Sequence, residues 1–308
     1  MGSRIIRTVV VGVGYLGQWH ARKAASIKSV KLIGVVDEDF GRAESLAKEL
    51  GCAAFGKVED VPDGIESAII AVPTEYHYKV ANALLDKGAH ILVEKPFTGF
   101  PKLAKKIINK AMHLKKKVAV GFVERMNSAF QRALLAKSKI SFVEARRLAP
   151  FKLRAEKLDV VKDLMIHDID LALCLLGEDV RVDYAWGERI ITKKPDLTGA
   201  AFVFKGGAKA YLMAGRIFNA EERVMNIINK EGILTLDLKK QQVLKLKRAR
   251  GEIVGRNLRI SADDALLKEL ENFFRLVRKE RSSIATGEEG LRALELACEV
   301  LKKAGRDC

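Results

Sequence analysis

The sequence of 308 residues predicts an α/β domain with a doubly wound parallel sheet, followed by an α+β domain with an open, mostly antiparallel sheet. Up to about residue 123, short apolar strands alternate with helical segments, which indicates right-handed βαβ units. After residue 124 the strands follow one another with short turns, which indicates antiparallel pairing. We therefore expect domains at 1–123 and 124–308, with the C-terminal helix able to pack back on the first domain.

The elements of the first domain are predicted from apolar runs and amphipathic segments. Gly51 and Gly88 end two of the helices, and Pro101 opens a third that has lysines in its last turn. The predicted strands are 7–11, 31–36, 67–72, 91–93 and 118–123, and the predicted helices are 15–27, 41–50, 76–87 and 101–116.

The second domain is predicted to begin with helices at 128–136 and 163–176. Gly206-Gly207 between two apolar runs is a hairpin signal. Two late helices follow at 262–279 and 288–304, the first with Ser261 as its N-cap. The predicted strands are 140–149, 181–190, 200–204, 208–217, 223–228, 233–238 and 242–246.

Composition excludes several classes of protein. The chain is 48% hydrophobic without an apolar run of about 18 residues, so no membrane span is expected. Its first residues lead into a strand and show no signal peptide. The cysteines lie far apart without a C-x-x-C pair, which argues against a zinc site and a disulfide framework and favours a reducing cytoplasm. They are Cys52, Cys174, Cys298 and Cys308.

The net charge of +16 has two interpretations. One is a nucleic-acid surface, and the other is a Lys/Arg-rich surface that attracts an anionic cofactor and substrate. Basic residues are spread along the chain, and the densest tracts, at 115–117 and 239–256, have almost no aromatics to stack on bases. We therefore expect no nucleic-acid partner.

A glycine loop predicts dinucleotide binding. Gly12-Val-Gly14-Tyr15-Leu16-Gly17 follows a strand and opens a helix, which is the context that the fingerprint requires. The glycines allow a tight turn, close approach of the pyrophosphate and close helix–strand packing, and the helix N-terminus favours the anion. The alternative is a glycine-rich turn that binds no dinucleotide.

Asp37 is the predicted contact for the adenosine ribose. It lies twenty residues after Gly17 at the end of the second strand, where a carboxylate can bind both ribose hydroxyls. It would also repel a 2′-phosphate, and Glu38 and Asp39 add to that repulsion. No arginine follows directly, so NAD is favoured over NADP.

Lys95 is the first candidate for catalysis. Glu94-Lys95-Pro96 ends a strand about eighty residues after the glycine loop, and the carboxyl ends of parallel strands line the ligand crevice. A cation there would stabilise an alkoxide as hydride departs. The alternative is a surface lysine followed by a proline that ends the strand.

Asp163 and His167 form the second candidate. On a helix they share a face, and an imidazole held by a carboxylate is a good general base near neutral pH. The alternative is a core or surface histidine. The spacing is not H-E-x-x-H and no third ligand stands at a diagnostic distance, so no metal is expected.

These motifs, with Ala71-Val-Pro73-Thr74-x-x-His77 and Asp163-x-x-x-His167-Asp-Ile-Asp170, resemble the Gfo/Idh/MocA oxidoreductase family. The resemblance implies a Rossmann domain, a second domain that commonly mediates oligomers, and Lys95, Asp163 and His167 as the catalytic trio, with the histidine as base. It also implies further cofactor contacts, namely Tyr15, Leu16, Pro73, Thr74, His77, Glu94, Lys95 and Pro96.

A narrower resemblance is to the UDP-N-acetylglucosamine 3-dehydrogenase branch, carried by Gly121-Phe-Val-Glu-Arg125, Pro150-Phe-x-x-Arg154 and the segment 160–170. Met126 and Ser128 depart from that branch. The resemblance implies NAD-dependent oxidation of a nucleotide sugar at C3, with Lys95, His167, Arg125 and Arg154 contacting the substrate. Arginine forks match phosphate oxygens, and a salt bridge is the alternative for each.

Two further functions stay open at this stage. One is a dehydrogenase of a free sugar or cyclitol, and the other is a non-enzymatic regulator that senses dinucleotide. Regulators of this fold can lose the lysine and histidine, whereas Lys95 and His167 are present. We expect a cytoplasmic homo-oligomer, a dimer or tetramer.

Overall fold

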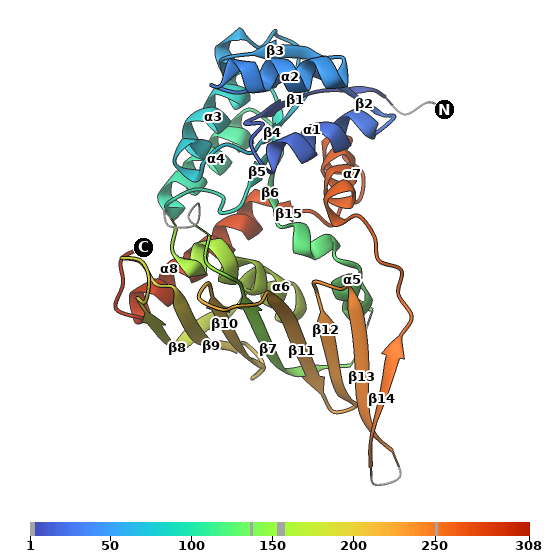
Figure 1. Ribbon diagram of the computed structural model, residues 1–308, viewed down its shortest axis with the longest axis vertical. Coiled ribbons are helices and arrows are strands. Elements are labelled where there is room, and N and C mark those ends of the chain that lie inside the picture. The colour runs from blue at the N-terminus through green and yellow to red at the C-terminus, as the bar shows by residue number, and fades with distance from the viewer. Residues whose placement is uncertain (1–3, 136–137, 153–157, 250–251) are drawn as a thin grey trace. The chain divides into compact units, whose positions relative to one another are not determined.

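The computed structural model describes residues 4–135, 138–152, 158–249 and 252–308 (Figure 1). The chain forms two compact units. The first comprises Met1–Val123 and Leu266–Leu291, and the second comprises Glu124–Ala265 and Arg292–Cys308. The second unit therefore differs from the expected continuous domain 124–308. The physical reason is the apolar face of one late helix, whose Leu270, Phe273 and Phe274 are buried in the core of the first unit.

The first unit contains a seven-stranded sheet in the order β15-β6-β5-β4-β1-β2-β3. All neighbours pair in parallel except β15, which is antiparallel to β6. The strands are rich in fully buried valine, isoleucine and leucine, as expected for a sheet covered on both faces. They are β1 (Ile6–Val11), β2 (Val30–Val36), β3 (Ala53–Phe55), β4 (Ser67–Ile70), β5 (His90–Glu94), β6 (Val118–Gly121) and β15 (Ala285–Thr286).

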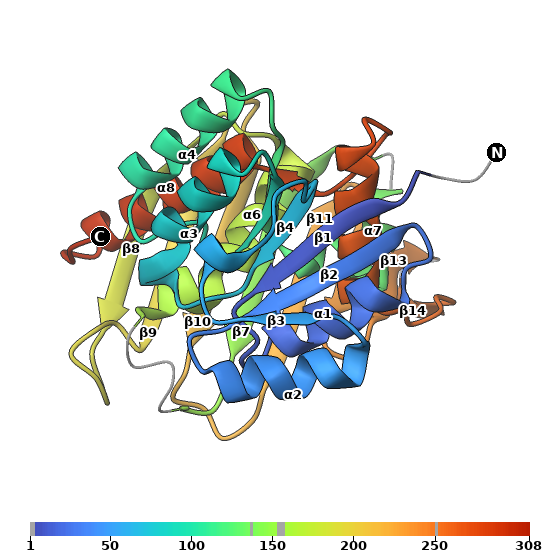
Figure 2. The ribbon, with the colours of Figure 1, turned by 90° about the horizontal axis from the view of Figure 1, so that it is seen from above.

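Helices cover both faces of this sheet, as Figure 2 shows for α1 and α2 on one side and α3 and α4 on the other. Residues of α1, α2 and α7 share one apolar core with the strands. The bounds are α1 (Gly17–Ser26), α2 (Phe40–Leu50), α3 (Thr74–Asp86), α4 (Pro101–His113) and α7 (Ala265–Val277), with a short 3-10 helix η1 (Val58–Asp60). The predicted doubly wound parallel sheet is confirmed.

The second unit contains an eight-stranded sheet in the order β14-β13-β12-β11-β7-β10-β9-β8. Every pair is antiparallel except β7 with β10, so the predicted mostly antiparallel sheet is confirmed. The strands are β7 (Ile140–Leu148), β8 (Val180–Glu188), β9 (Leu197–Phe204), β10 (Lys209–Gly215), β11 (Glu222–Asn229), β12 (Gly232–Asp237), β13 (Gln242–Ala249) and β14 (Glu252–Leu258). Gly206 and Gly207 form the predicted turn between β9 and β10, both with positive φ.

Helices α5 and α6 contact strands of this second sheet. The bounds are η2 (Val123–Met126), α5 (Ser128–Leu134), the π-helix η4 (Val161–Met165), α6 (Ile166–Leu176) and α8 (Gly287–Lys303), whose residues divide between the two units. Among the described residues, no helix is long and apolar enough to span a membrane.

Some local predictions were wrong. The sequence analysis missed β3, β14 and β15, because three- and two-residue strands carry no periodicity and β14 is charged and exposed. Helix α7 begins at Ala265, so Ser261 is not its N-cap. Tertiary pairing, not local sequence, defines these segments.

The cysteine prediction also needs correction. Cys298 on α8 and Cys308 form a disulfide, with Cα atoms 5.0 Å apart. Gly305, with φ of 69°, turns the chain back after the helix and brings Cys308 to Cys298. Cys52 and Cys174 are not in disulfides. The argument from cysteine spacing for a reducing compartment therefore loses its basis.

Asp196 organises the loop that joins β8 to β9. Its Oδ2 accepts hydrogen bonds from the backbone N–H groups of Ile190, Ile191 and Thr192 at 2.9, 2.7 and 2.8 Å. Its Oδ1 accepts from Arg216 Nε at 2.9 Å. Burial by itself would raise the pKa of Asp196, but these donors outweigh it and hold the pKa well below its usual range.

We predict that Asp196→Asn lowers the free energy of unfolding at pH 7 by about 3 kcal/mol, because it leaves the buried Arg216 without its counter-charge. A depressed pKa stabilises the fold above the unfolded value of about 3.9, and this contribution is lost as the pH falls below it. Denaturant titrations from pH 7 to pH 3 should therefore show the gap between wild type and variant shrinking. A difference in unfolding free energy between wild type and variant that is constant with pH would contradict the stabilising role of the Asp196 carboxylate.

One face of the second sheet carries large, partly exposed apolar side chains. On β10, Leu212 is buried, whereas Tyr211 and Met213 point to the opposite face and are partly exposed. Phe142 on the neighbouring β7 is also partly exposed. An apolar sheet face of this kind usually requires cover.

We predict that this face mediates self-association. Wild type should show a mass above that of one chain in light scattering at micromolar concentration. Met213→Glu should shift it toward the monomer, whereas Lys28→Glu, an exposed control in the first unit, should not. A monomeric wild type would contradict the prediction.

Candidate active site

In the glycine loop between β1 and α1, a side chain at Gly12 or Gly17 would clash with the backbone. Gly12 has φ of 83°, and a Cβ there would lie 2.7 Å from the backbone nitrogen of Val72. A Cβ on Gly17 would lie 1.7 Å from the carbonyl oxygen of Gly12. No side chain in the described structure caps the N-terminus of α1. A tight turn that leads to an uncapped helix N-terminus fits the pyrophosphate of a dinucleotide.

A cavity of about 900 Å³ lies in the first unit at the carboxyl ends of β1, β2 and β4. Five of the predicted contacts line it: Gly12, Gly14, Tyr15, Asp37 and Pro73. The sequence analysis missed further lining residues, among them Arg42, Tyr76 and Lys79. These three stand on helix faces without a motif, so only the fold reveals them. Leu16 and Thr74 adjoin lining residues in the chain.

Asp37 is held in place by its own backbone surroundings. Its Oδ2 accepts from the N–H of Val13 at 2.8 Å and its Oδ1 from that of Asp39 at 3.0 Å. Arg42 Nη1 lies 3.4 Å from both carboxylate oxygens. The sequence analysis noted that no arginine follows Asp37 directly, yet α2 brings one back from five residues on. Such an arginine can accommodate a 2′-phosphate, which weakens the argument against NADP.

Lys95 directly follows β5 and is partly buried, as expected for a residue at a strand end. Glu94 and Pro96, the two neighbours of Lys95 in the motif, are buried. Glu94 is 8% exposed, and its Oε1 lies 2.7 Å from His20 Nε2 inside the unit. Pro96 is buried as well, and the bond between Lys95 and Pro96 is cis. The carboxylate of Glu94 is therefore directed into the protein, and a role of this residue in cofactor binding stays a prediction.

His77, another predicted cofactor residue, is buried. It is 1% exposed, with Nε2 2.9 Å from the carbonyl oxygen of Val72 and Nδ1 3.1 Å from that of Pro96. Burial lowers the pKa of His77, so the ring is neutral near pH 7 and donates through one nitrogen. The ring links the loops after β4 and β5 instead of facing the cavity.

Asp163 and His167 lie in the second unit. Asp163 is on the π-helix η4 and His167 is in the first turn of α6. Within 161–170 only Asp163, Leu164 and His167 are partly exposed. The sequence analysis assumed α-helical spacing, whereas residues 161–165 form a π-helix, whose hydrogen bonds join residues five apart. Such π segments occur frequently at functional sites.

Arg125 forms a buried ion pair within the second unit. Its Nε and Nη2 lie 2.8 and 2.6 Å from the two carboxylate oxygens of Asp170 on α6, and its side chain is 7% exposed. This geometry favours the salt-bridge alternative over contact with a diphosphate. Arg154 lies outside the described residues.

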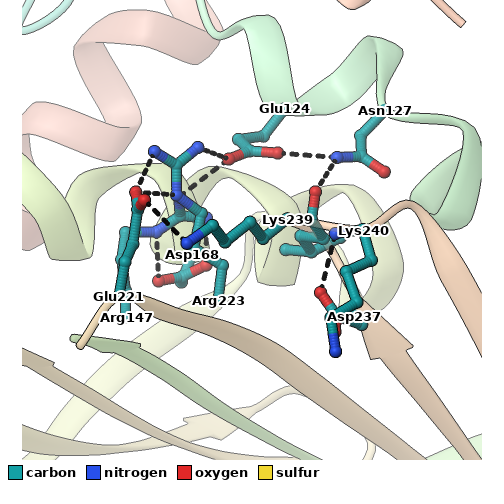
Figure 3. Close-up of polar contacts among 10 residues, drawn as sticks. Glu124, Asn127, Arg147, Asp168, Glu221, Arg223, Asp237, Lys239 and Lys240 are labelled. Atoms are coloured by element: carbon teal, nitrogen blue, oxygen red, sulfur yellow. Dashed lines mark hydrogen bonds and ion pairs between the residues drawn. The ribbon is translucent and has the colours of Figure 1, made fainter. Parts of the chain in front are cut away.

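A second buried arginine holds the same helix (Figure 3). Arg147 on β7 donates to both carboxylate oxygens of Asp168, at 2.9 and 2.8 Å, and to Glu124 at 2.8 Å. Burial by itself would lower the pKa of Arg147, but the two carboxylates raise it, so the guanidinium stays charged. The network continues over the strand ends through Arg223, Glu221 and Lys239, and Asn127 also donates to Glu124.

The network pairs three cations with three carboxylates, of which Arg147, Glu124 and Asp168 are buried. Together with Arg125–Asp170 it anchors α6 at Asp168 and Asp170, one and three residues after His167. Motif analysis saw Asp168 and Asp170 as part of a pattern but gave no signal for Arg147, whose partner lies 21 residues away.

The chain is similar to known oxidoreductases over most of its length. Residues 6–122 match a family model described as "Oxidoreductase family, NAD-binding Rossmann fold". The chain is 34% identical, over 96% of its length and 96% of the relative, to UDP-N-acetylglucosamine 3-dehydrogenase of Acidithiobacillus ferrooxidans. It is 27% identical to scyllo-inositol 2-dehydrogenase (NAD(+)) of Bacillus subtilis, over 94% and 92% of the two chains.

The solved structure of UDP-N-acetylglucosamine 3-dehydrogenase from Acidithiobacillus ferrooxidans superimposes with a TM-score of 0.90, covering 97% of each chain. Both the Rossmann unit and the mostly antiparallel second sheet are therefore shared along the whole chain. The chain belongs to the Gfo/Idh/MocA family of NAD-binding oxidoreductases.

Proposed function

We propose that the protein is an NAD-dependent dehydrogenase that oxidises a hydroxyl of a nucleotide sugar to a ketone, at C3 of UDP-N-acetylglucosamine or a close relative of it. The observation that carries this proposal is the 34% identity to a UDP-N-acetylglucosamine 3-dehydrogenase over nearly the whole of both chains. The presence of Lys95, Asp163 and His167 supports it, since a non-enzymatic relative has no need of all three.

The roles of these residues follow from their chemistry. When bound, NAD accepts the hydride from the carbon that bears the hydroxyl. His167 removes the hydroxyl proton, and Asp163 orients the imidazole. Lys95 stabilises the negative charge that develops on the oxygen. The ion pairs of Asp168 and Asp170 hold α6, so the base does not need to be positioned anew for each turnover.

The inositol dehydrogenase relative favours a second candidate, oxidation of a cyclitol or free sugar. The two candidates differ in the diphosphate, which calls for cationic partners. The test is to mix the protein with NAD and either UDP-N-acetylglucosamine or scyllo-inositol and to follow absorbance of reduced cofactor. Turnover of the sugar nucleotide alone supports the proposal, and turnover of the cyclitol alone would overturn it.

For the cofactor, we propose NAD in preference to NADP. The carboxylate of Asp37 accepts bonds from ribose hydroxyls and opposes a phosphate, although Arg42 reduces that opposition. We predict that Asp37→Ala weakens NAD binding at least tenfold, because a charge-assisted hydrogen bond is worth about 1.5–3 kcal/mol. In direct titrations, the difference between the affinities for NAD and for NADP should be smaller in this variant than in wild type. Tighter binding of NADP by wild type would sink the assignment.

We predict that His167→Ala and Lys95→Ala slow hydride transfer by about 10²–10⁴-fold while NAD affinity changes little. Both residues act on charge that appears only in the transition state, so kcat falls and not the binding of cofactor. Asp163→Asn should give an intermediate loss. Single-turnover NAD reduction with a confirmed substrate is the measurement. Near wild-type rates in both alanine variants would return the histidine to an ordinary structural role.

A further inference from the structure

Three titratable side chains are buried together in the first unit, next to Lys95 in the chain. His20 comes from α1, Glu94 from the end of β5 and Glu269 from α7, and they are 0%, 8% and 1% exposed. One polar atom from each lies within 4.8 Å of the others. The three elements are far apart in the sequence, so only the fold brings this cluster together.

Glu94 is the member of the cluster that touches the Lys95 backbone. Its Oε2 accepts the N–H of Lys95 at 3.2 Å, and its Oε1 lies 2.7 Å from His20 Nε2. Gly121 on β6 leaves room for the carboxylate, since a Cβ there would lie 2.9 Å from Oε1. Each oxygen of the Glu94 carboxylate therefore has a defined partner, and strand β6 packs against the carboxylate at Gly121.

Two buried carboxylates this close cannot both ionise without a large cost. Glu94 accepts the N–H of Lys95 through one oxygen, and His20 Nε2 lies within hydrogen-bond distance of the other. A shared metal ion fits less well, because two ligands about 2.0–2.2 Å from one ion lie roughly 3 Å or more apart, and His20 and Glu94 are 2.7 Å apart.

We propose that Glu94 is a positioning residue for Lys95. Its contact with His20 fastens the end of β5 to α1, the helix whose N-terminus faces the predicted pyrophosphate site. The lysine and the cofactor thereby keep a fixed spacing. This inference rests on the proposed function, because it assigns a role relative to Lys95. A displacement of about 1 Å at a reacting group can cost about 10²-fold in rate, so the arrangement has a measurable consequence.

The test compares five variants in single-turnover NAD reduction with UDP-N-acetylglucosamine, with NAD affinity and melting temperature measured for each. Glu94→Gln keeps the size but removes the charge and should slow the reaction about 10²-fold, with NAD affinity within about threefold of wild type. Gly121→Ala displaces the intact carboxylate and should act in the same way, which covers a Glu94→Gln protein that fails to fold.

Glu269→Gln keeps the size of the side chain and leaves the contacts of Glu94 with His20 and the Lys95 backbone in place, so its rate should stay within about threefold of wild type. The matched control is Glu271→Gln, an exposed position on the same helix α7. Wild-type rates in Glu94→Gln and Gly121→Ala would overturn the inference. A Glu269→Gln protein as slow as Glu94→Gln, or a stoichiometric metal ion in the purified wild type, would also overturn it.

Lys95→Ala, the fifth variant, separates this inference from the function on which it rests. If Lys95→Ala reduces NAD slowly while Glu94→Gln and Gly121→Ala react at the wild-type rate, the positioning role of Glu94 is refuted and the proposed function is not. A fast Lys95→Ala, or a wild type that reduces no NAD with this substrate, defeats the proposed function.

Discussion

The site of the first unit depends on one constraint: β1, β2, β4 and β5 are parallel and end at the same edge of the sheet. At that edge lie the glycine loop, Asp37, Pro73 and Lys95, although they are spread over more than eighty residues of the sequence. The cavity at this edge and the uncapped helix N-terminus follow from the same arrangement. A dinucleotide site and a candidate catalytic lysine are thus products of one topology.

Buried charge is used in both units to hold functional segments. In the second unit, Arg147 and Arg125 pair with Asp168 and Asp170, which directly follow His167 on α6. In the first unit, Glu94 ties the backbone of Lys95 to α1. Breaking one partner of a buried pair costs several kcal/mol, so these contacts resist displacement more than surface pairs do.

The sequence was informative where a pattern is local. The glycine loop, the Gly206-Gly207 turn and the strand–helix alternation predicted the class of both sheets correctly, although three strands were missed. The sequence carried less information where the reason is tertiary. Glu94 and His77 look like cofactor contacts in a motif, yet the fold directs both side chains inward. Arg42 and Arg147 carry no signal at all, because their partners are defined by helix and strand packing and not by spacing.

The central claim is that hydride leaves C3 of a nucleotide sugar for the nicotinamide. The most direct measurement is mass spectrometry of reduced NAD formed from UDP-N-acetylglucosamine deuterated only at C3. The account predicts reduced NAD that is heavier by one deuterium, together with a primary isotope effect in single turnover. Unlabelled reduced NAD would show that another carbon is oxidised and would contradict the account.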